Sequence, residues 1–248
     1  MTAPVYFHDD FTGLEVGKPF TFTGSEAHHA CVMRVAPGEE IHLVDGHGLR
    51  VISEVISAAD KSVTVRPREI KNETSIRPVT TLVQALAKGG RDEQAVEMAT
   101  EVGIDKVIAW QSQRTIVKWE GKKQGKNLEK WSNLLKAATK QSRRSRIPTV
   151  DYAESTKSLL NKLTDAKLLV LHESGEHTLE QIPTEWFDTT EIALIVGPEG
   201  GITEAELAAF TAQGAQIVRI GNTVMRSSTA GTVALALVNY LSGRYNQN

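Results

Sequence analysis

The sequence has 248 residues, of which 40% are hydrophobic, so it can bury one large core or two modest ones. Charged residues make up 23% and the formal net charge is −2, so any surface for nucleic acid must be a local basic patch. Cys31 is the only cysteine, which excludes an internal disulfide and a cysteine-rich zinc site. No segment reaches the ~18 apolar residues that span a bilayer and no signal peptide is recognisable, so we expect a cytoplasmic protein without a membrane partner.

The first 73 residues have the pattern of a compact β-barrel or sandwich. Short segments alternate apolar and polar residues and end at turn residues, and Asp45-Gly46 is typical of a hairpin turn. One short helix is expected to begin at Ser25. The expected strands are 20–22, 40–44, 51–56 and 62–65.

From about residue 78 the pattern changes to apolar strands alternating with helices, which predicts an α/β domain with a mostly parallel sheet and helices on both faces. The polar stretch 68–78 separates the two patterns, so we predict domains at 1–73 and 74–248. A polar loop rich in lysine and glycine is expected at 121–126. The expected strands are 79–86, 106–110, 167–172, 191–196 and 216–220, and the expected helices are 92–102, 128–141, 155–163, 205–210 and 230–241.

The strongest local motif is Gly197-Pro198-Glu199-Gly200-Gly201, which directly follows the apolar strand ending at Val196. Thr203 and Glu206 have the spacing of a capping box, so the next helix begins there. Glycines at the carboxyl end of a parallel strand let a ligand approach the backbone, and open α/β sheets bind ligands at this edge. The motif therefore predicts a binding loop, with an ordinary glycine-rich turn as the alternative.

A second loop, 221–229, also follows a strand and precedes a helix. It places Arg226 among hydroxyl side chains near a helix N-terminus, which suits an anionic ligand or a developing negative charge. Ser228 and Thr229 also fit the role of a helix cap, which does not exclude a contact with a ligand.

A third loop begins at 171–173, where another apolar strand ends. His172 and His177 resemble a metalloprotease signature, but they are five residues apart and not four, so we expect no metal. The sequence also lacks a Gly-x-Gly-x-x-Gly motif after a strand and a phosphate-binding P-loop, which disfavours a dehydrogenase or a nucleotide-driven enzyme. The three loops together predict one binding site built from several strand ends.

Basic residues cluster between Lys136 and Arg146, where five of eleven residues are basic and none is acidic. Such a cluster can neutralise several phosphates, although a solvated surface is the alternative. Lys88, Arg91 and Arg114 lie near the ends of other elements and extend the set.

Residues 192–202 (Ile-Ala-Leu-Ile-Val-Gly-Pro-Glu-Gly-Gly-Ile) resemble the cofactor loop of the RsmE family, the uridine-N3 methyltransferases of 16S ribosomal RNA within the SPOUT superfamily. The resemblance covers nearly the whole chain. The other matching parts are 82–89 and 99–103 in the first strand and helix of the second domain, 141–143 and 147–148 in its centre, and His28, His29, Val32, Arg34, Gly38 and Glu39 in the first domain.

This resemblance implies a small PUA-like β-barrel that binds RNA, followed by a SPOUT-type α/β domain with a deep C-terminal trefoil knot. It implies S-adenosyl-L-methionine as the cofactor, 16S rRNA of the small ribosomal subunit as the partner, and a homodimer as the active form. The residues expected to bind the cofactor are Leu171, His172, Glu173, Val196, Gly197, Pro198, Glu199, Gly200, Gly201, Ile220, Gly221, Met225, Ser227, Ser228 and Thr229.

The implied reaction transfers a methyl group to N3 of one uridine, which must be unpaired or splayed out because N3 lies on the Watson–Crick edge. Arg226 is the candidate catalytic residue, since its charge can stabilise negative charge on the uracil oxygens. Ser228 stands where many family members have glutamate, so no general base is assigned there, and Val5 stands where the family often has arginine. The residues expected to contact RNA are Arg34, Lys88, Arg91, Arg114, Lys140, Arg143, Arg144 and Arg146.

Two alternatives stay open at the level of the sequence. One is a non-catalytic protein that docks on the ribosome or another RNA, against which the intact glycine loop 197–201 argues. The other is a SPOUT methyltransferase that acts on a different RNA, such as transfer RNA, or on a ribose hydroxyl.

Overall fold

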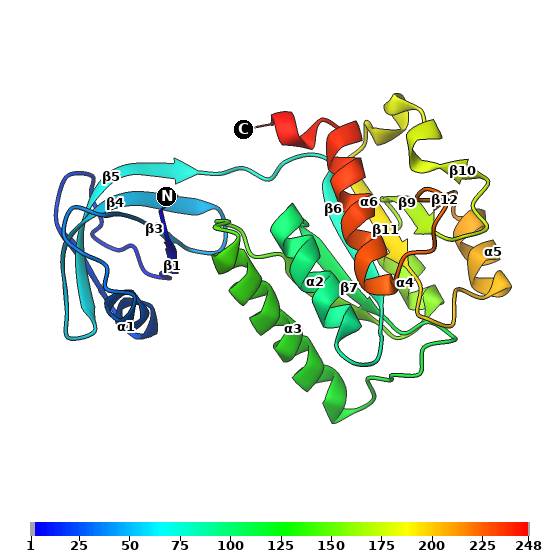
Figure 1. The fold of residues 1–248 in the computed structure, drawn as a ribbon, viewed down its shortest axis with the longest axis horizontal. Helices are drawn as coiled ribbons and strands as arrows, with labels where there is room; N and C mark the ends of the chain where they lie inside the picture. The colour runs from blue at the N-terminus through cyan, green and yellow to red at the C-terminus, as the bar shows by residue number, and fades with distance from the viewer. Residues whose placement is uncertain (1–2, 248) are drawn as a thin grey trace. The chain divides into compact units, whose positions relative to one another are not determined.

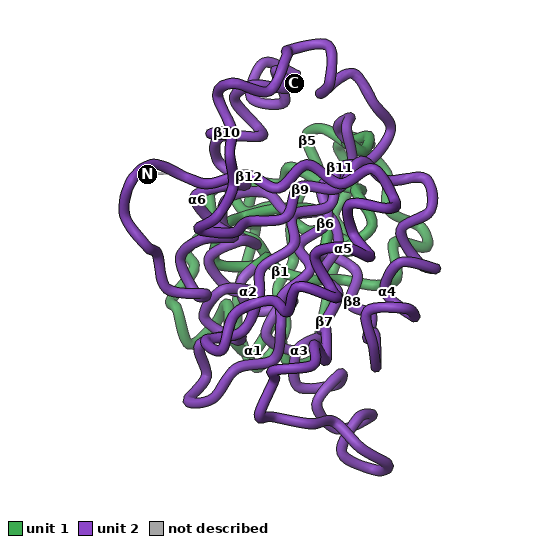
Figure 2. Tube along the Cα trace, turned by 90° about the vertical axis from the view of Figure 1, so that its right-hand side faces the viewer, with its two compact units in different colours: residues 1–75, 139–147 green, residues 76–138, 148–248 purple. Residues whose placement is uncertain are grey.

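The computed structural model describes residues 3–247, and the chain divides into two compact units. Unit 1 contains Met1–Ser75 and Thr139–Ile147, and unit 2 contains Ile76–Ala138 and Pro148–Asn248 (Figure 2). Unit 1 thus includes a short segment from deep inside the range that the sequence assigned to the second domain.

Unit 1 is built on a curled five-stranded sheet with an apolar core (Figure 1). The strands are β1 (Val5–Phe7), β2 (Phe20–Thr23), β3 (Glu40–Val44), β4 (Leu49–Ala59) and β5 (Ser62–Asn72). Their order is β1-β3-β4-β5-β2, with β1 parallel to β3 and all other neighbours antiparallel. Helix α1 (Ser25–Val32) closes the core, in which Tyr6, Phe22 and Val51 are buried.

The four strands and the helix expected in this unit are confirmed, and β1 was missed. All three residues of β1 are buried, so it lacks the alternation of apolar and polar residues that reveals a half-exposed strand.

Unit 2 contains a seven-stranded sheet in which all neighbouring strands are parallel. The strands are β6 (Val79–Ala85), β7 (Lys106–Trp110), β8 (Thr149–Ala153), β9 (Lys167–Leu171), β10 (His177–Thr178), β11 (Glu191–Val196) and β12 (Gln216–Arg219). Their order is β10-β12-β9-β11-β6-β7-β8, so neighbours in the sheet are mostly distant in the sequence. Parallel neighbours need crossover connections, which place helices over the sheet.

Helices cover both faces of this sheet (Figure 1). The α-helices are α2 (Arg91–Val102), α3 (Lys122–Gln141), α4 (Thr156–Lys162), α5 (Glu204–Ala212) and α6 (Ser227–Leu241), and the 3₁₀ helices are η1 (Leu179–Gln181), η2 (Thr184–Phe187) and η3 (Arg244–Asn246). Helices α2 and α6 pack together, and Asn239 Nδ2 donates to the Val102 carbonyl at 3.0 Å. On the opposite face, Phe210 of α5 meets Trp110 of β7, with ring centroids 5.5 Å apart. No helix in residues 3–247 is both long and apolar enough to cross a membrane.

Two expectations about the helices were wrong. Helix α3 begins at Lys122, where a polar loop was expected over 121–126, because lysine and glutamine favour helix and the buried Trp131 and Leu135 anchor the element. Helix α6 begins at Ser227, three residues before the apolar spacing that predicted it.

Strands β8 and β10 were also missed. Both form edges of the sheet, and β10 has only two residues, so neither carries a long buried apolar run.

Gly231 lets α6 lie close on the sheet. A Cβ atom at this position would be 2.7 Å from Leu82 Cδ1 of β6 and 3.2 Å from Val196 Cγ2 of β11. Because Val196 is the last residue of β11, this contact holds the first half of α6 over the carboxyl edge of the sheet.

We predict opposite effects for one substitution at two helical glycines. Gly125→Ala in α3 adds a methyl group in open space and should raise the free energy of unfolding by about 0.5–1 kcal/mol. Gly231→Ala forces the methyl group against Leu82 and should lower it by about 1 kcal/mol, since overpacking outweighs the gain in helix propensity. Urea unfolding of both variants tests this, and a stabilised Gly231→Ala would contradict the close packing of α6.

Candidate active site

A cavity of about 380 Å³ opens at the carboxyl edge of the unit 2 sheet. Its walls are the loops after β9, β11 and β12, which are adjacent because β9 pairs with both of the other strands. The structure thus brings the three predicted loops together. The predicted cofactor residues that line the cavity are Leu171, His172, Glu173, Val196, Gly197, Pro198, Glu199, Gly201, Ile220, Gly221, Met225 and Ser227.

Three predicted cofactor residues, Gly200, Ser228 and Thr229, do not line the cavity. Gly200 faces Arg114, whereas Ser228 is buried and Thr229 is exposed in the first turn of α6. Arg226, the candidate catalytic residue, does line it. The lining residues that the sequence did not single out are Ile202, Val218, Arg219, Asn222, Thr223, Val224 and Ala230.

The loop after β11 exposes backbone because side chains have no room there. A Cβ atom on Gly197 would lie 2.6 Å from Ile202 Cγ1, so this position accepts only glycine without movement of a buried side chain. Gly201 has φ +76°, in the left-handed region, and its N–H donates to the Pro198 carbonyl at 2.9 Å. The result is a tight turn whose backbone is not covered by side chains at its glycines.

The loop after β9 is held against β12. A Cβ atom on Gly175 would lie 2.7 Å from the Val218 carbonyl carbon, and the His172 N–H donates to the Val218 carbonyl oxygen at 3.0 Å. The His172 ring interacts locally, with Nδ1 2.7 Å from Ser174 Oγ. Within residues 3–247, no cluster of three or more histidine, cysteine or carboxylate side chains is arranged to hold a metal ion.

The third loop ends at the start of α6. The N-cap is Arg226, whose carbonyl accepts from the N–H groups of Thr229 and Ala230 at 2.9 and 3.0 Å, so neither Ser228 nor Thr229 is the cap. Ser227 Oγ is buried and has no hydrogen-bond partner within the described part of the chain. A buried hydroxyl group on the wall of a cavity is suited to a bound polar ligand, because an unmade buried hydrogen bond is costly.

Two predicted RNA-binding arginines contact the glycine loop. Arg91 Nη1 lies 3.2 Å from Glu199 Oε1, and both side chains are roughly half exposed. Arg114 Nη1 donates to the Gly200 carbonyl at 3.0 Å. These arginines therefore link the loops after β6 and β7 to the cavity wall.

Buried Asp92 anchors the turn that contains exposed Lys88. Its carboxylate accepts from the N–H groups of Ala87 at 3.1 Å and Glu93 at 2.9 Å. Burial raises the pKa of Asp92, against the lowering effect of these hydrogen bonds. No sequence motif indicates this role, because the partners of Asp92 are defined by the path of the turn.

Glu206 does not line the cavity, but it joins three elements that meet beside the loop after β11. Its side chain is buried, with Oε1 accepting from the Gln113 N–H and the Thr156 hydroxyl, both at 2.9 Å. Its Oε2 accepts from the Thr203 N–H at 3.0 Å, which completes the predicted capping box. One carboxylate thus joins the starts of α4 and α5 to the loop after β7.

The basic residues of unit 1 divide into two groups. Lys140 Nζ lies 2.6 Å from Glu26 Oε2 and 5.2 Å from the centroid of the Tyr6 ring, so its charge is used within the unit. Arg146 donates two hydrogen bonds to the main-chain oxygen of Glu73, at 2.9 and 2.6 Å. In contrast, Arg34 and Arg143 are exposed.

Comparison with known proteins identifies the family. Residues 74–239 match the family model of an RNA methyltransferase domain, and residues 22–68 match that of an RNA methyltransferase PUA domain. The chain is 38% identical to ribosomal RNA small subunit methyltransferase E of Mycobacterium tuberculosis, over 99% of this chain and 95% of that protein. The Bacillus subtilis enzyme of the same name is 30% identical over 92% of both chains.

The chain belongs to the ribosomal RNA small subunit methyltransferase E family. A crystal structure of the Neisseria gonorrhoeae member bound to S-adenosyl methionine has a TM-score of 0.82 and 25% identity, and covers 97% of this chain and 98% of that one. The resemblance found in the sequence is confirmed, as is the class of RNA methyltransferase. The predicted fold class is confirmed in its SPOUT-type α/β domain with a parallel sheet and its preceding PUA domain with a curled sheet.

We predict that Glu206→Gln destabilises unit 2 by about 2–3 kcal/mol, because an amide nitrogen in place of one carboxylate oxygen would face N–H or O–H donors in a buried site. Glu204→Gln is the matched control, since Glu204 is exposed in the first turn of the same helix. Urea unfolding of both variants measures the difference. Equal stabilities would show that the buried carboxylate does not hold these three elements together.

Proposed function

We propose that this protein transfers a methyl group from S-adenosyl-L-methionine to N3 of a uridine in the 16S rRNA of the small ribosomal subunit. One observation carries the proposal: three strand-end loops form a glycine-lined cavity in a chain of the methyltransferase E family. The proposed substrate is found where ribosomes are assembled, so we place the protein in the cytoplasm.

The residues of the cavity fit the proposed cofactor. The bare turn at 197–201 admits a ligand close to the backbone, and the buried Ser227 hydroxyl offers a hydrogen bond that the protein itself leaves unmade. When bound, S-adenosyl-L-methionine supplies an electrophilic methyl group on a positively charged sulfur. The residues proposed to hold it are Leu171, His172, Glu173, Val196, Gly197, Pro198, Glu199, Gly201, Ile220, Gly221, Met225 and Ser227, whereas Gly200, Ser228 and Thr229 lie outside the cavity lining.

Arg226 is proposed to act on the uracil. Loss of the N3 proton leaves negative charge on the two uracil oxygens, and a permanently charged guanidinium group at the cavity wall stabilises that charge. Alignment of the uracil nitrogen with the methyl group provides the rest of the acceleration. Ser228 carries no carboxylate, so the chain has no acid–base residue at that position in the first turn of α6.

Lysine and arginine side chains that reach the protein surface are proposed to bind the phosphates of the RNA. In unit 2 these are Arg91 at the start of α2, which lines the cavity, Arg114, which bonds to the glycine loop, and the exposed Lys88. In unit 1 they are Arg34 and Arg143, which are exposed, whereas Arg144 is half-buried and Lys140 and Arg146 support the fold through internal partners. Guanidinium groups suit this role because they can bind a phosphate through two hydrogen bonds.

A homodimer is proposed through α6. Its outward face carries Val233, Ala236, Leu237 and Tyr240, and the side chains of Leu237 and Tyr240 are 38% and 74% exposed. An apolar stripe of this kind at helical spacing is unfavourable in water and suits burial against a second copy. The same helix begins at the cavity, so dimer formation would place the partner near the site.

The decisive experiment is to map methylated nucleotides in rRNA from cells that lack the gene. Loss of one N3-methyluridine from 16S rRNA, with restoration by the purified protein and S-adenosyl-L-methionine, is the expected result. Loss of a modification from transfer RNA or from a ribose hydroxyl would replace the proposed substrate, and no loss together with no cofactor binding would favour a non-catalytic role.

We predict that Arg226→Ala lowers kcat by at least about 100-fold while S-adenosyl-L-methionine still binds within about threefold of the wild-type Kd. Arg226→Lys keeps the charge but loses the planar fork, so an intermediate kcat is expected. Transfer of labelled methyl groups to unmethylated small subunits measures kcat, and calorimetry measures cofactor binding. Wild-type turnover of Arg226→Ala would remove this residue from the mechanism.

We predict that Tyr240→Glu and Leu237→Glu convert a dimer into a monomer, because each places a charge in the apolar stripe. Ile116→Glu is the control, since Ile116 is 72% exposed but lies outside α6. Sedimentation velocity gives the mass of each variant. A wild-type monomer, or variants that remain dimeric, would contradict the proposed use of α6.

A further inference from the structure

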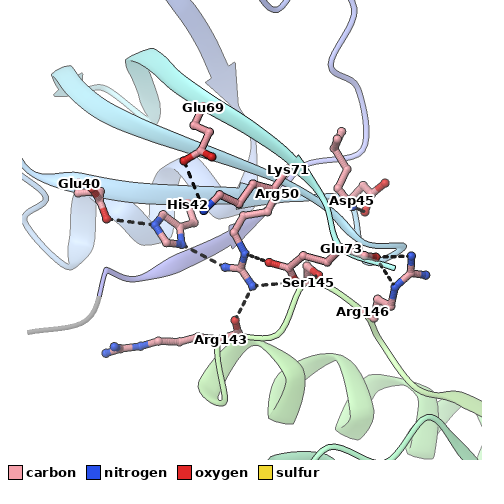
Figure 3. Close-up of polar contacts among 11 residues, drawn as sticks. Glu40, His42, Asp45, Arg50, Glu69, Lys71, Glu73, Arg143, Ser145 and Arg146 are labelled. Atoms are coloured by element: carbon pink, nitrogen blue, oxygen red, sulfur yellow. Dashed lines mark hydrogen bonds and ion pairs between the residues drawn. The ribbon is translucent and has the colours of Figure 1, made fainter. Parts of the chain in front are cut away.

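The segment 139–147 is bound to the β3–β4 hairpin of unit 1. The Gly48 N–H donates to the Ser145 carbonyl at 3.2 Å, and the Ile147 N–H donates to the Gly46 carbonyl at 2.9 Å. A network of charged side chains from β3, β4 and the end of β5 also holds this segment (Figure 3). None of the residues of this network lines the cavity described above.

Arg50 of β4 is the central cation of the network. Its side chain is 12% exposed, and its guanidinium group is paired with the Glu73 carboxylate through Nε and Nη2. Nη1 lies 3.1 Å from His42 Nδ1, and Nη2 donates to the main-chain carbonyl of Arg143 at 2.9 Å. The buried cation therefore fixes the backbone at Arg143.

Glu73 holds the two neighbouring positions. Its carboxylate accepts from the Ser145 hydroxyl, and its main-chain oxygen accepts from Nε and Nη2 of Arg146. Burial alone would raise the pKa of Glu73, but hydrogen bonds from Arg50 and Ser145 and the charges of Arg50 and Arg146 outweigh it and lower the pKa. The carboxylate therefore stays ionised at neutral pH, as the network requires.

The turn is fixed on both sides of one exposed arginine. Arg143 has φ +59°, a left-handed conformation that is unfavourable for a residue with a side chain unless its surroundings hold it. Its side chain points away from the network (Figure 3) and forms no ion pair with any carboxylate in residues 3–247. The network thus uses the paired charges of Arg50 and Glu73 to present an unneutralised guanidinium group to solvent.

We propose that Arg50 and Glu73 are positioning residues that hold the 143–146 turn in the conformation in which Arg143 binds an RNA phosphate. This inference rests on the proposed function, and it names the part of unit 1 that contacts the substrate. A guanidinium group fixed in advance loses less conformational freedom on binding, which is why the network should increase affinity. Phosphate is the favoured partner because the exposed Arg143 guanidinium group forms no ion pair with a carboxylate in residues 3–247 and can bind a phosphate through two hydrogen bonds.

The direction in which Glu73→Gln changes the affinity for RNA distinguishes a positioning role from a purely electrostatic one. Removal of a negative charge beside a basic turn strengthens binding to a polyanion if only charge matters. If Glu73 positions the turn, binding to a labelled transcript of 16S rRNA should weaken about fivefold. The association constant should also depend less steeply on salt, with the magnitude of the slope of its logarithm against log salt concentration smaller by about one. Glu69→Gln is the matched control: it removes a carboxylate paired with Lys71 on the same strand and leaves the turn intact.

A double-mutant cycle tests whether Glu73 acts through Arg143. Arg143→Ala should weaken RNA binding, and Glu73→Gln combined with Arg143→Ala should bind no more weakly than Arg143→Ala alone. Additive losses would overturn the inference, because Glu73 would then act by another route. Ser145→Ala changes no charge and removes only the hydroxyl that Glu73 accepts from, so it carries the test if Glu73→Gln fails to fold.

Cofactor binding separates this inference from the proposed function. Each variant should bind S-adenosyl-L-methionine with the wild-type Kd, since the turn and the cavity lie in different units. A Glu73→Gln variant that binds the transcript as tightly as the wild type, or more tightly, would overturn the inference alone. A wild-type protein that binds neither the transcript nor the cofactor would overturn the proposed function together with it.

Discussion

The parallel pairing of β9 with β11 and β12 is the constraint on which the candidate active site depends. Leu171 at the end of β9 lies beside Val196 of β11 on one side and Val218 of β12 on the other. Parallel strands that pair in this register end at the same edge, so three segments distant in the sequence must turn within reach of one another. A slip in register would separate the loops even if each kept its own conformation.

Because the cavity is built from tight turns, its clearest signal in the sequence is the glycine motif. The close approach of Ile202 to Gly197 and the left-handed φ of Gly201 both restrict the chain to glycine, so the motif stands out in the amino-acid sequence itself. Most strands and helices were predicted for a similar reason, since apolar periodicity reports local burial. The start of α3 was missed because polar residues fit a loop and an exposed helical turn equally well.

Contacts between distant residues could not be predicted. Thr203 and Glu206 were recognised as a capping box, a local pattern, but the bonds of Glu206 to Gln113 and Thr156 depend on how three elements meet. The same holds for segment 139–147, which begins in the last turn of α3 and then pairs with the β3–β4 hairpin of unit 1. Sequence patterns report which face of an element is buried, and tertiary pairing decides what that face meets.

The basic cluster shows how tertiary pairing assigns different roles to similar side chains. Lys140 is paired with Glu26 and lies over the Tyr6 ring, and Arg146 bonds to the Glu73 carbonyl, so both charges are used within the fold. Arg143, in the same run of sequence, extends into solvent. A cation that already has a partner must give it up before it can bind a phosphate, whereas an exposed and fixed cation gains the interaction directly. The number of basic residues in the run therefore overstates how many are available to bind a phosphate, because partners within the fold hold Lys140 and Arg146.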